Sequence, residues 1–95
     1  GIEPAEFITH IAITTLENNL RSLYDNEKMP LTGPIARGDI DSVRRHLEAM
    51  KDSGEILKPY IMLSKATVEL AYSEGFIDRQ AYEGFMELFE DMGMI

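Results

Sequence analysis

Apolar residues recur every three or four positions along most of this chain, and this spacing constrains the fold more than any other feature. The pattern covers Pro4–Tyr24, a segment that follows Asp39 and stops at Gly54, a segment from Pro59 to Glu74, and one from Asp78 to Met92. Apolar residues with this period lie on one face of an α-helix. No strand-like alternation and no internal repeat is apparent. The sequence therefore predicts an all-α fold with four main helices.

Size and charge limit the classes of function that remain. Ninety-five residues suit a single helical domain, residues 1–95. The net charge of −8, from 17 acidic and 9 basic residues, disfavours nucleic acid and anionic membranes as partners. The chain has no cysteine, no apolar run long enough to span a membrane and no signal-peptide pattern. We therefore expect a cytoplasmic protein without a metal site.

The segment Pro30–Asp39 interrupts the helical pattern and holds two of the four prolines and two of the seven glycines. Its glycines permit unusual backbone geometry, and Arg37 offers a planar fork of donors that suits a carboxylate or a phosphate. Asp39 is a good N-cap for the following helix. Two interpretations stay open: Arg37 faces a binding cleft, or it pairs internally with Asp39 or a carboxylate of the first helix. The cleft interpretation selects these candidate residues: Asn18, Thr32, Gly33, Pro34, Arg37, Gly38 and Asp39.

Four polar residues lie inside the predicted helices. Asn18 and Asn19 lie in the middle of the first helix, where they either line a cleft or bond to the following loop. His10 and His46 each stand without a partner at metal-ligand spacing, and both are predicted to be on the surface. The chain contains no glycine-rich dinucleotide fingerprint, phosphate-binding loop or nucleophile elbow, so no catalytic residue is assigned and no cofactor is expected to bind this chain by itself.

The third predicted helix is apolar on two faces. Its second stripe consists of Ile61, Val68 and Tyr72. A helix with two apolar faces is buried on both of them. Either a second subunit or domain covers this stripe, which predicts a homodimer, or the three other helices of the chain enclose it.

Several short motifs resemble a known family. They are Leu31–Pro34, Arg37–Asp39, Val43 with His46 and Leu47, Thr15–Asn18, and Gly1–Pro4. Together they resemble an uncharacterised C-terminal domain that follows a Rossmann-like NAD(P)-binding domain. The resemblance covers roughly the first two-thirds of the chain, and the tail beyond Gly75 matches only as a generic amphipathic helix.

The resemblance implies a fold like the C-terminal helical domain of phosphogluconate dehydrogenase, ketopantoate reductase and pyrroline-carboxylate reductase. In such proteins the helical domain closes one side of the active-site cleft and mediates dimerisation, and NAD or NADP is held by the other domain. That other domain is absent here, so we expect residues 1–95 to be the C-terminal fragment of a two-domain, oxidoreductase-like protein. The alternative is a free-standing, non-catalytic helical interaction module.

Overall fold

Four helices make up the fold, as the apolar spacing predicted. The computed structural model describes residues 4–24 and 31–93, so the motif residues Gly1–Glu3 and Pro30 lie outside the described part. The helices are α1 (Pro4–Tyr24), α2 (Ile40–Met50), α3 (Gly54–Ser73) and α4 (Arg79–Gly93). The described segments contain no strand, and none of their helices is long and apolar enough to cross a membrane.

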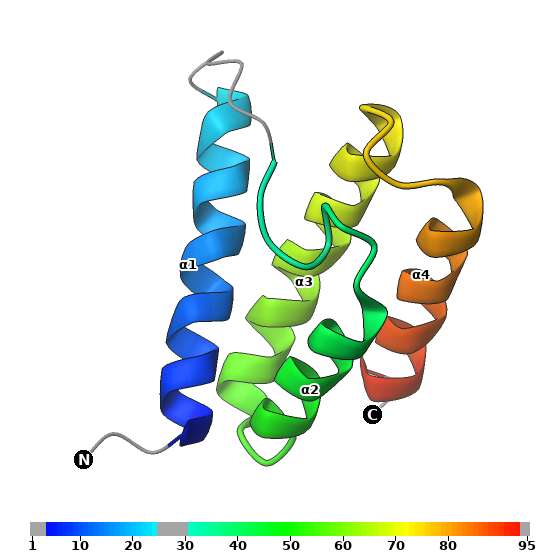
Figure 1. Cartoon of the computed structure of the whole chain (residues 1–95). Coiled ribbons are helices and arrows are strands. Elements are labelled where there is room, and N and C mark those ends of the chain that lie inside the picture. Colours follow the sequence, from blue (N-terminus) through cyan, green and yellow to red (C-terminus); the bar gives the residue numbers. More distant parts are fainter. Residues whose placement is uncertain (1–3, 25–30, 94–95) are drawn as a thin grey trace.

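The helices are arranged with α3 at the centre (Figure 1). Helix α1 packs against α2 and α3, and α4 packs against the other side of the same two helices. Within the described residues, α1 and α4 make no contact with each other. The largest fully buried apolar side chains all lie on α2, α3 and α4: Val43, Leu47, Met50, Tyr60, Val68, Phe85 and Phe89.

The boundary between α2 and α3 differs from the prediction. Gly54 does not end α2; it is the first residue of α3, and α2 ends four residues earlier, at Met50. The amide N–H groups of Ile56 and Leu57 both donate to the carbonyl of Ser53, at 2.9 Å, and this bonding starts the helix before Pro59. Pro59 is consequently accommodated inside α3 rather than opening it.

The two-faced helix α3 is enclosed by its own neighbours. Val68 is fully buried and Ile61 is only 8% exposed, although both were candidates for contact with a second subunit. All three other helices of the chain, α1, α2 and α4, contact α3. Tyr72 remains 39% exposed and stacks on Tyr82 of α4, with ring centroids 4.7 Å apart.

Gly75 ends α3 as predicted. Its φ of 80° is in the left-handed region, which glycine adopts without steric cost. The N–H of Phe76 donates to Ala71 and the N–H of Gly75 donates to Tyr72, which is the pair of bonds of a Schellman motif. Asp78 then accepts a hydrogen bond from the N–H of Ala81 at 2.8 Å and so begins α4.

Candidate functional site

The loop 31–39 contains a single helical turn that ends at Gly38. The N–H of Asp39 donates to Pro34 at 2.8 Å, and the N–H of Gly38, whose φ is 70°, donates to Ile35 at 3.0 Å. These two bonds repeat the arrangement seen at the end of α3. Ile35 is only 3% exposed and anchors the turn in the core. The proline and glycine of this motif therefore fix the backbone path that leads into α2.

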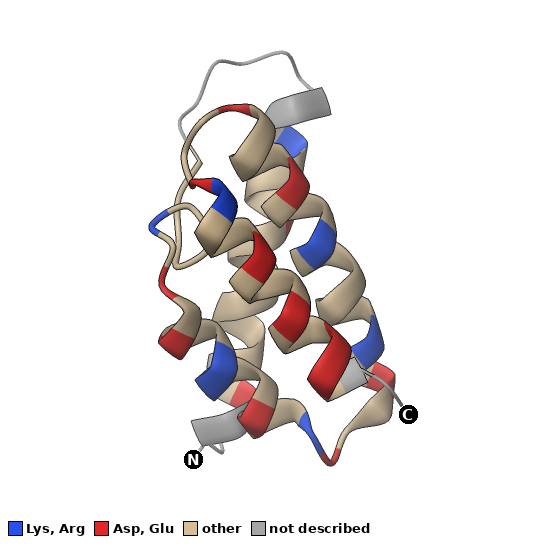
Figure 2. Cartoon of the chain, turned by 90° about the vertical axis from the view of Figure 1, so that its right-hand side faces the viewer, with Lys and Arg blue, Asp and Glu red and all other residues tan. Residues whose placement is uncertain are grey.

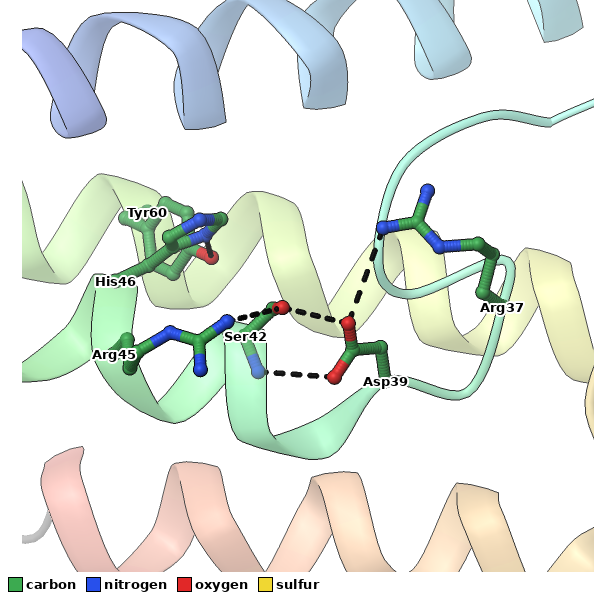
Figure 3. Close-up of polar contacts among 6 residues, drawn as sticks. All are labelled: Arg37, Asp39, Ser42, Arg45, His46 and Tyr60. Atoms are coloured by element: carbon green, nitrogen blue, oxygen red, sulfur yellow. Dashed lines mark hydrogen bonds and ion pairs between the residues drawn. The ribbon is translucent and has the colours of Figure 1, made fainter.

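Asp39 caps α2 as the sequence predicted. Its carboxylate accepts a hydrogen bond from the Ser42 N–H at 3.1 Å and from the Ser42 hydroxyl at 2.6 Å (Figure 3). The Ser42 hydroxyl and N–H, together with the Arg37 guanidinium, lower the pKa of the Asp39 carboxyl. Caps of this type satisfy an N–H of the first helical turn that has no partner within the helix. Asp39 is thus a structural residue of the loop.

Asn19 ties the other end of the loop to α1. Its side-chain amide donates to the Thr32 carbonyl at 2.8 Å, and its carbonyl accepts from the Thr32 N–H at 3.1 Å. Of the two interpretations of the adjacent asparagines, bonding to the following loop is confirmed for Asn19, which is 4% exposed. Asn18, the neighbouring residue on α1, is exposed.

Gly33 lets the loop pass close to α1. Its φ is 93°, and a Cβ atom at this position would lie 2.6 Å from the Cγ2 atom of Thr15. That separation is shorter than any ordinary carbon–carbon contact. The loop is therefore held against α1 by a hydrogen-bonded amide at Thr32 and by the absence of a side chain at the next residue.

A pocket of about 150 Å³ lies between α1, the loop 31–39 and α2. Of the predicted cleft residues, Thr32, Pro34 and Arg37 line it, whereas Asn18, Gly33, Gly38 and Asp39 do not. Asn19 also lines the pocket, so both interpretations of this residue hold. The structure adds lining residues that were not predicted to face a cleft: Ile11, Thr15, Ile35, Ser42, His46 and Tyr60. Within the described residues, no group of acidic residues and histidines is placed to bind a metal ion.

His46 is half-buried in this pocket, so its predicted surface position is wrong. Its Nδ1 atom lies 3.0 Å from the hydroxyl of Tyr60, and the two rings meet edge to face (Figure 3). Burial and the nearby Arg45 lower the pKa of His46, and burial raises the pKa of Tyr60 to about 12. At neutral pH the pair therefore consists of an uncharged imidazole and a protonated phenol. Each of these groups can donate or accept a hydrogen bond, and neither carries a charge.

The spacing of residues on α2 contained a signal for the half-buried position of His46. Ser42 and His46 are four residues apart, so they share one face of α2, adjacent to the buried Val43 and Leu47. Two preceding arginines, Arg44 and Arg45, suggested instead that the whole neighbourhood was exposed. In the structure both arginines are exposed and His46 turns inward to α3.

Arg37 is at the mouth of the pocket with 64% of its side chain exposed. The nearest oxygen of Asp39 is 3.9 Å from its guanidinium, beyond hydrogen-bond distance. An exposed pair of this length contributes little to stability. Arg45 donates to the hydroxyl of Ser42 at 2.9 Å on the same side of α2. The pocket mouth thus presents an arginine fork next to hydroxyl and imidazole groups, an arrangement that suits a small anionic or polar ligand.

Comparison with known proteins places this site within one family. No curated protein and no solved structure matches the chain. Residues 1–67 match a family described as a domain of unknown function, DUF2520. The matched residues include α1, the loop 31–39, α2 and every residue that lines the pocket, whereas α4 lies outside them. Because the match covers more than half of the chain, this protein belongs to the DUF2520 family.

Proposed function

We propose that this domain forms the substrate side of the active-site cleft in an NAD(P)-dependent, oxidoreductase-like protein. The dinucleotide would be held by a separate Rossmann-like domain, as in the proteins related to phosphogluconate dehydrogenase that the sequence resembles. The observation that carries the proposal is the pocket at the loop 31–39, where Arg37, Ser42 and His46 meet. A pocket with largely apolar walls and a few polar groups, shaped by a loop on a helical scaffold, is typical of a ligand site.

The surface beside the pocket supports docking of another domain. Phe7 and Ile11, one helical turn apart on α1, are 54% and 47% exposed. Ile11 also lines the pocket. Covering such an apolar pair at a pocket mouth with another surface is favourable, because it removes apolar side chains from water. A dinucleotide-binding domain placed over Phe7 and Ile11 would close the pocket and bring its cofactor towards Arg37.

Pairing with a second copy is part of the same proposal. Since Ile61 and Val68 are buried within the chain, Tyr72 is the candidate contact that keeps an exposed face. Phe76, at the same end of α3, is 43% exposed. These two aromatic side chains lie at the opposite end of α3 from Leu57 and Tyr60, and a two-fold contact there would leave the pocket open.

The proposal predicts that dinucleotide binding requires residues outside this chain. Calorimetric titration of NADPH and NADH is expected to give no measurable binding to the 95-residue chain, because it has no glycine-rich phosphate turn. The protein translated from the full coding sequence is expected to bind one of them with a micromolar Kd. Micromolar binding by the 95-residue chain, or a full coding sequence without a Rossmann-like segment, would contradict the proposal and favour a non-catalytic module.

Arg37→Lys tests whether the arginine acts in the cleft. Lysine keeps the charge but loses the planar fork, so a cleft role predicts a several-fold higher Kd for NADPH in the full-length protein. The melting temperature of the 95-residue chain should be nearly unchanged, because the Arg37–Asp39 pair is exposed and 3.9 Å long. If the melting temperature of the 95-residue chain instead falls by several degrees while the NADPH affinity of the full-length protein is unaltered, Arg37 has a structural role within the domain.

A further inference from the structure

A second, larger hollow lies on the other side of the molecule. It is a groove of about 600 Å³ between the first half of α3 and the last turns of α4. Leu57, Ile61 and Phe89 form its apolar floor, and all three are at least nine-tenths buried. The groove shares no lining residue with the pocket at the loop 31–39. It therefore needs an explanation of its own.

The rim of the groove carries an exposed apolar residue between two lysines. Met62 is 72% exposed, more than any other large apolar residue among those described. Lys58 and Lys65 also line the groove, four residues before Met62 and three residues after it. This spacing places all three on one face of α3. Methionine is adaptable and is common at surfaces that bind the apolar face of a helix.

The charge of this rim is opposite to that of the rest of the protein. Lys51, Lys58 and Lys65 line the groove with a single acid, Glu90, although the chain as a whole has a net charge of −8. Acidic residues dominate the exposed side of α4, and basic residues lie on the helix beside it (Figure 2). Among the described residues, Lys58 and Lys65 form no ion pair, whereas Arg44, Lys51 and Arg79 each pair with a carboxylate of their own helix or turn.

We propose that this groove docks an acidic amphipathic helix of a partner protein. The apolar face of that helix would cover Met62 and the floor of the groove, and its carboxylates would pair with Lys58 and Lys65. These lysines are seven residues apart on α3, which is about 10.5 Å along the axis. The partner's carboxylates should therefore be about two turns apart and flank its apolar stripe. This proposal does not depend on the proposed oxidoreductase role.

Two helical peptides of one design test the proposal. Both carry the same leucine stripe, and one has glutamate while the other has lysine at the flanking positions. Fluorescence anisotropy with the 95-residue chain at low salt is expected to give a Kd for the glutamate peptide about tenfold below that for the lysine peptide. In the charge-reversed variant Lys58→Glu/Lys65→Glu this preference should be inverted. Equal affinity for both peptides, or a preference that the double variant leaves unaltered, overturns the proposal.

Matched variants separate the groove from the rest of the surface. Met62→Ser should weaken the glutamate peptide at least several-fold, whereas Ile56→Ser, an exposed α3 residue outside the groove, should not. Arg21→Glu on α1 reverses one positive charge, as each of the two lysine substitutions does, but no residue of α1 lines the groove, so it should have little effect. A dimer in sedimentation equilibrium that Lys58→Glu/Lys65→Glu dissociates would assign the groove to a second copy. Binding of phosphatidylserine vesicles that competes with the peptide would assign it to a membrane. Either outcome overturns the proposal.

Discussion

Tyr60→Ala is expected to lower the free energy of unfolding by about 3–5 kcal/mol. Tyr60 is 1% exposed and is among the largest fully buried side chains, so removing its ring leaves a cavity between α2 and α3 under the pocket. A domain of this size is stable by about 5–15 kcal/mol, so this loss is a large share of the total. Urea denaturation followed by circular dichroism measures it.

The matched variant Tyr60→Phe keeps the ring and removes only the hydroxyl. It loses the 3.0 Å contact with His46, and the expected cost is about 1 kcal/mol. The difference between the two variants isolates the contribution of ring packing. If phenylalanine and alanine destabilise the chain equally, the hydroxyl rather than the ring holds α2 to α3, and the packing described for Tyr60 is wrong.

Gly33→Ala is expected to cost about 2–4 kcal/mol of unfolding free energy, an unusually large effect for one methyl group in a loop. Part of the cost is the φ of 93°, which a residue with a Cβ adopts only with strain. The rest comes from overpacking, since the new Cβ would lie 2.6 Å from the Cγ2 of Thr15. Thermal and urea unfolding both measure the loss.

Two further variants separate strain from overpacking. Gly75→Ala is the control for strain alone, because its φ is 80° and no atom lies within 4 Å of a Cβ at that position. It should cost about 1–2 kcal/mol. Thr15→Ser removes Cγ2, so Gly33→Ala combined with Thr15→Ser should recover the overpacking part and leave the strain. A double variant as unstable as Gly33→Ala alone would show that the loop does not approach Thr15.

The helices could be predicted because their signals are local. The spacing of apolar residues, the capping aspartates and Gly75 act within a few residues of where they stand. The exception is the start of α3, where the sequence favoured Pro59 because proline is common in a first helical turn. Bonding to the Ser53 carbonyl decided the boundary instead. Serine is a preferred N-cap residue, and this local signal was overlooked because Gly54 was interpreted as the end of the preceding helix.

The pocket was predicted only in part, because it is built from pairs distant in the chain. Asn19 and Thr32 are 13 residues apart, and His46 and Tyr60 are 14 apart. The sequence identified Thr32, Pro34 and Arg37 from the composition of the loop, and these residues do line the pocket. The position of Tyr60 depends on the packing of α3 between the other helices, which periodicity alone does not determine.

Among the described residues, α1 does not contact α4, so α1 forms an outer layer of the domain against α2 and α3. Helices α2, α3 and α4 contact one another, whereas α1 and the loop tied to it by Asn19 form an outer layer against α2 and α3. The pocket lies at the seam, so a molecule inside it touches both layers. A ligand that binds only when α1 is packed against α2 and α3 would stabilise this packed state relative to a state in which α1 has separated. We therefore expect occupancy of the pocket to stabilise the docking of α1.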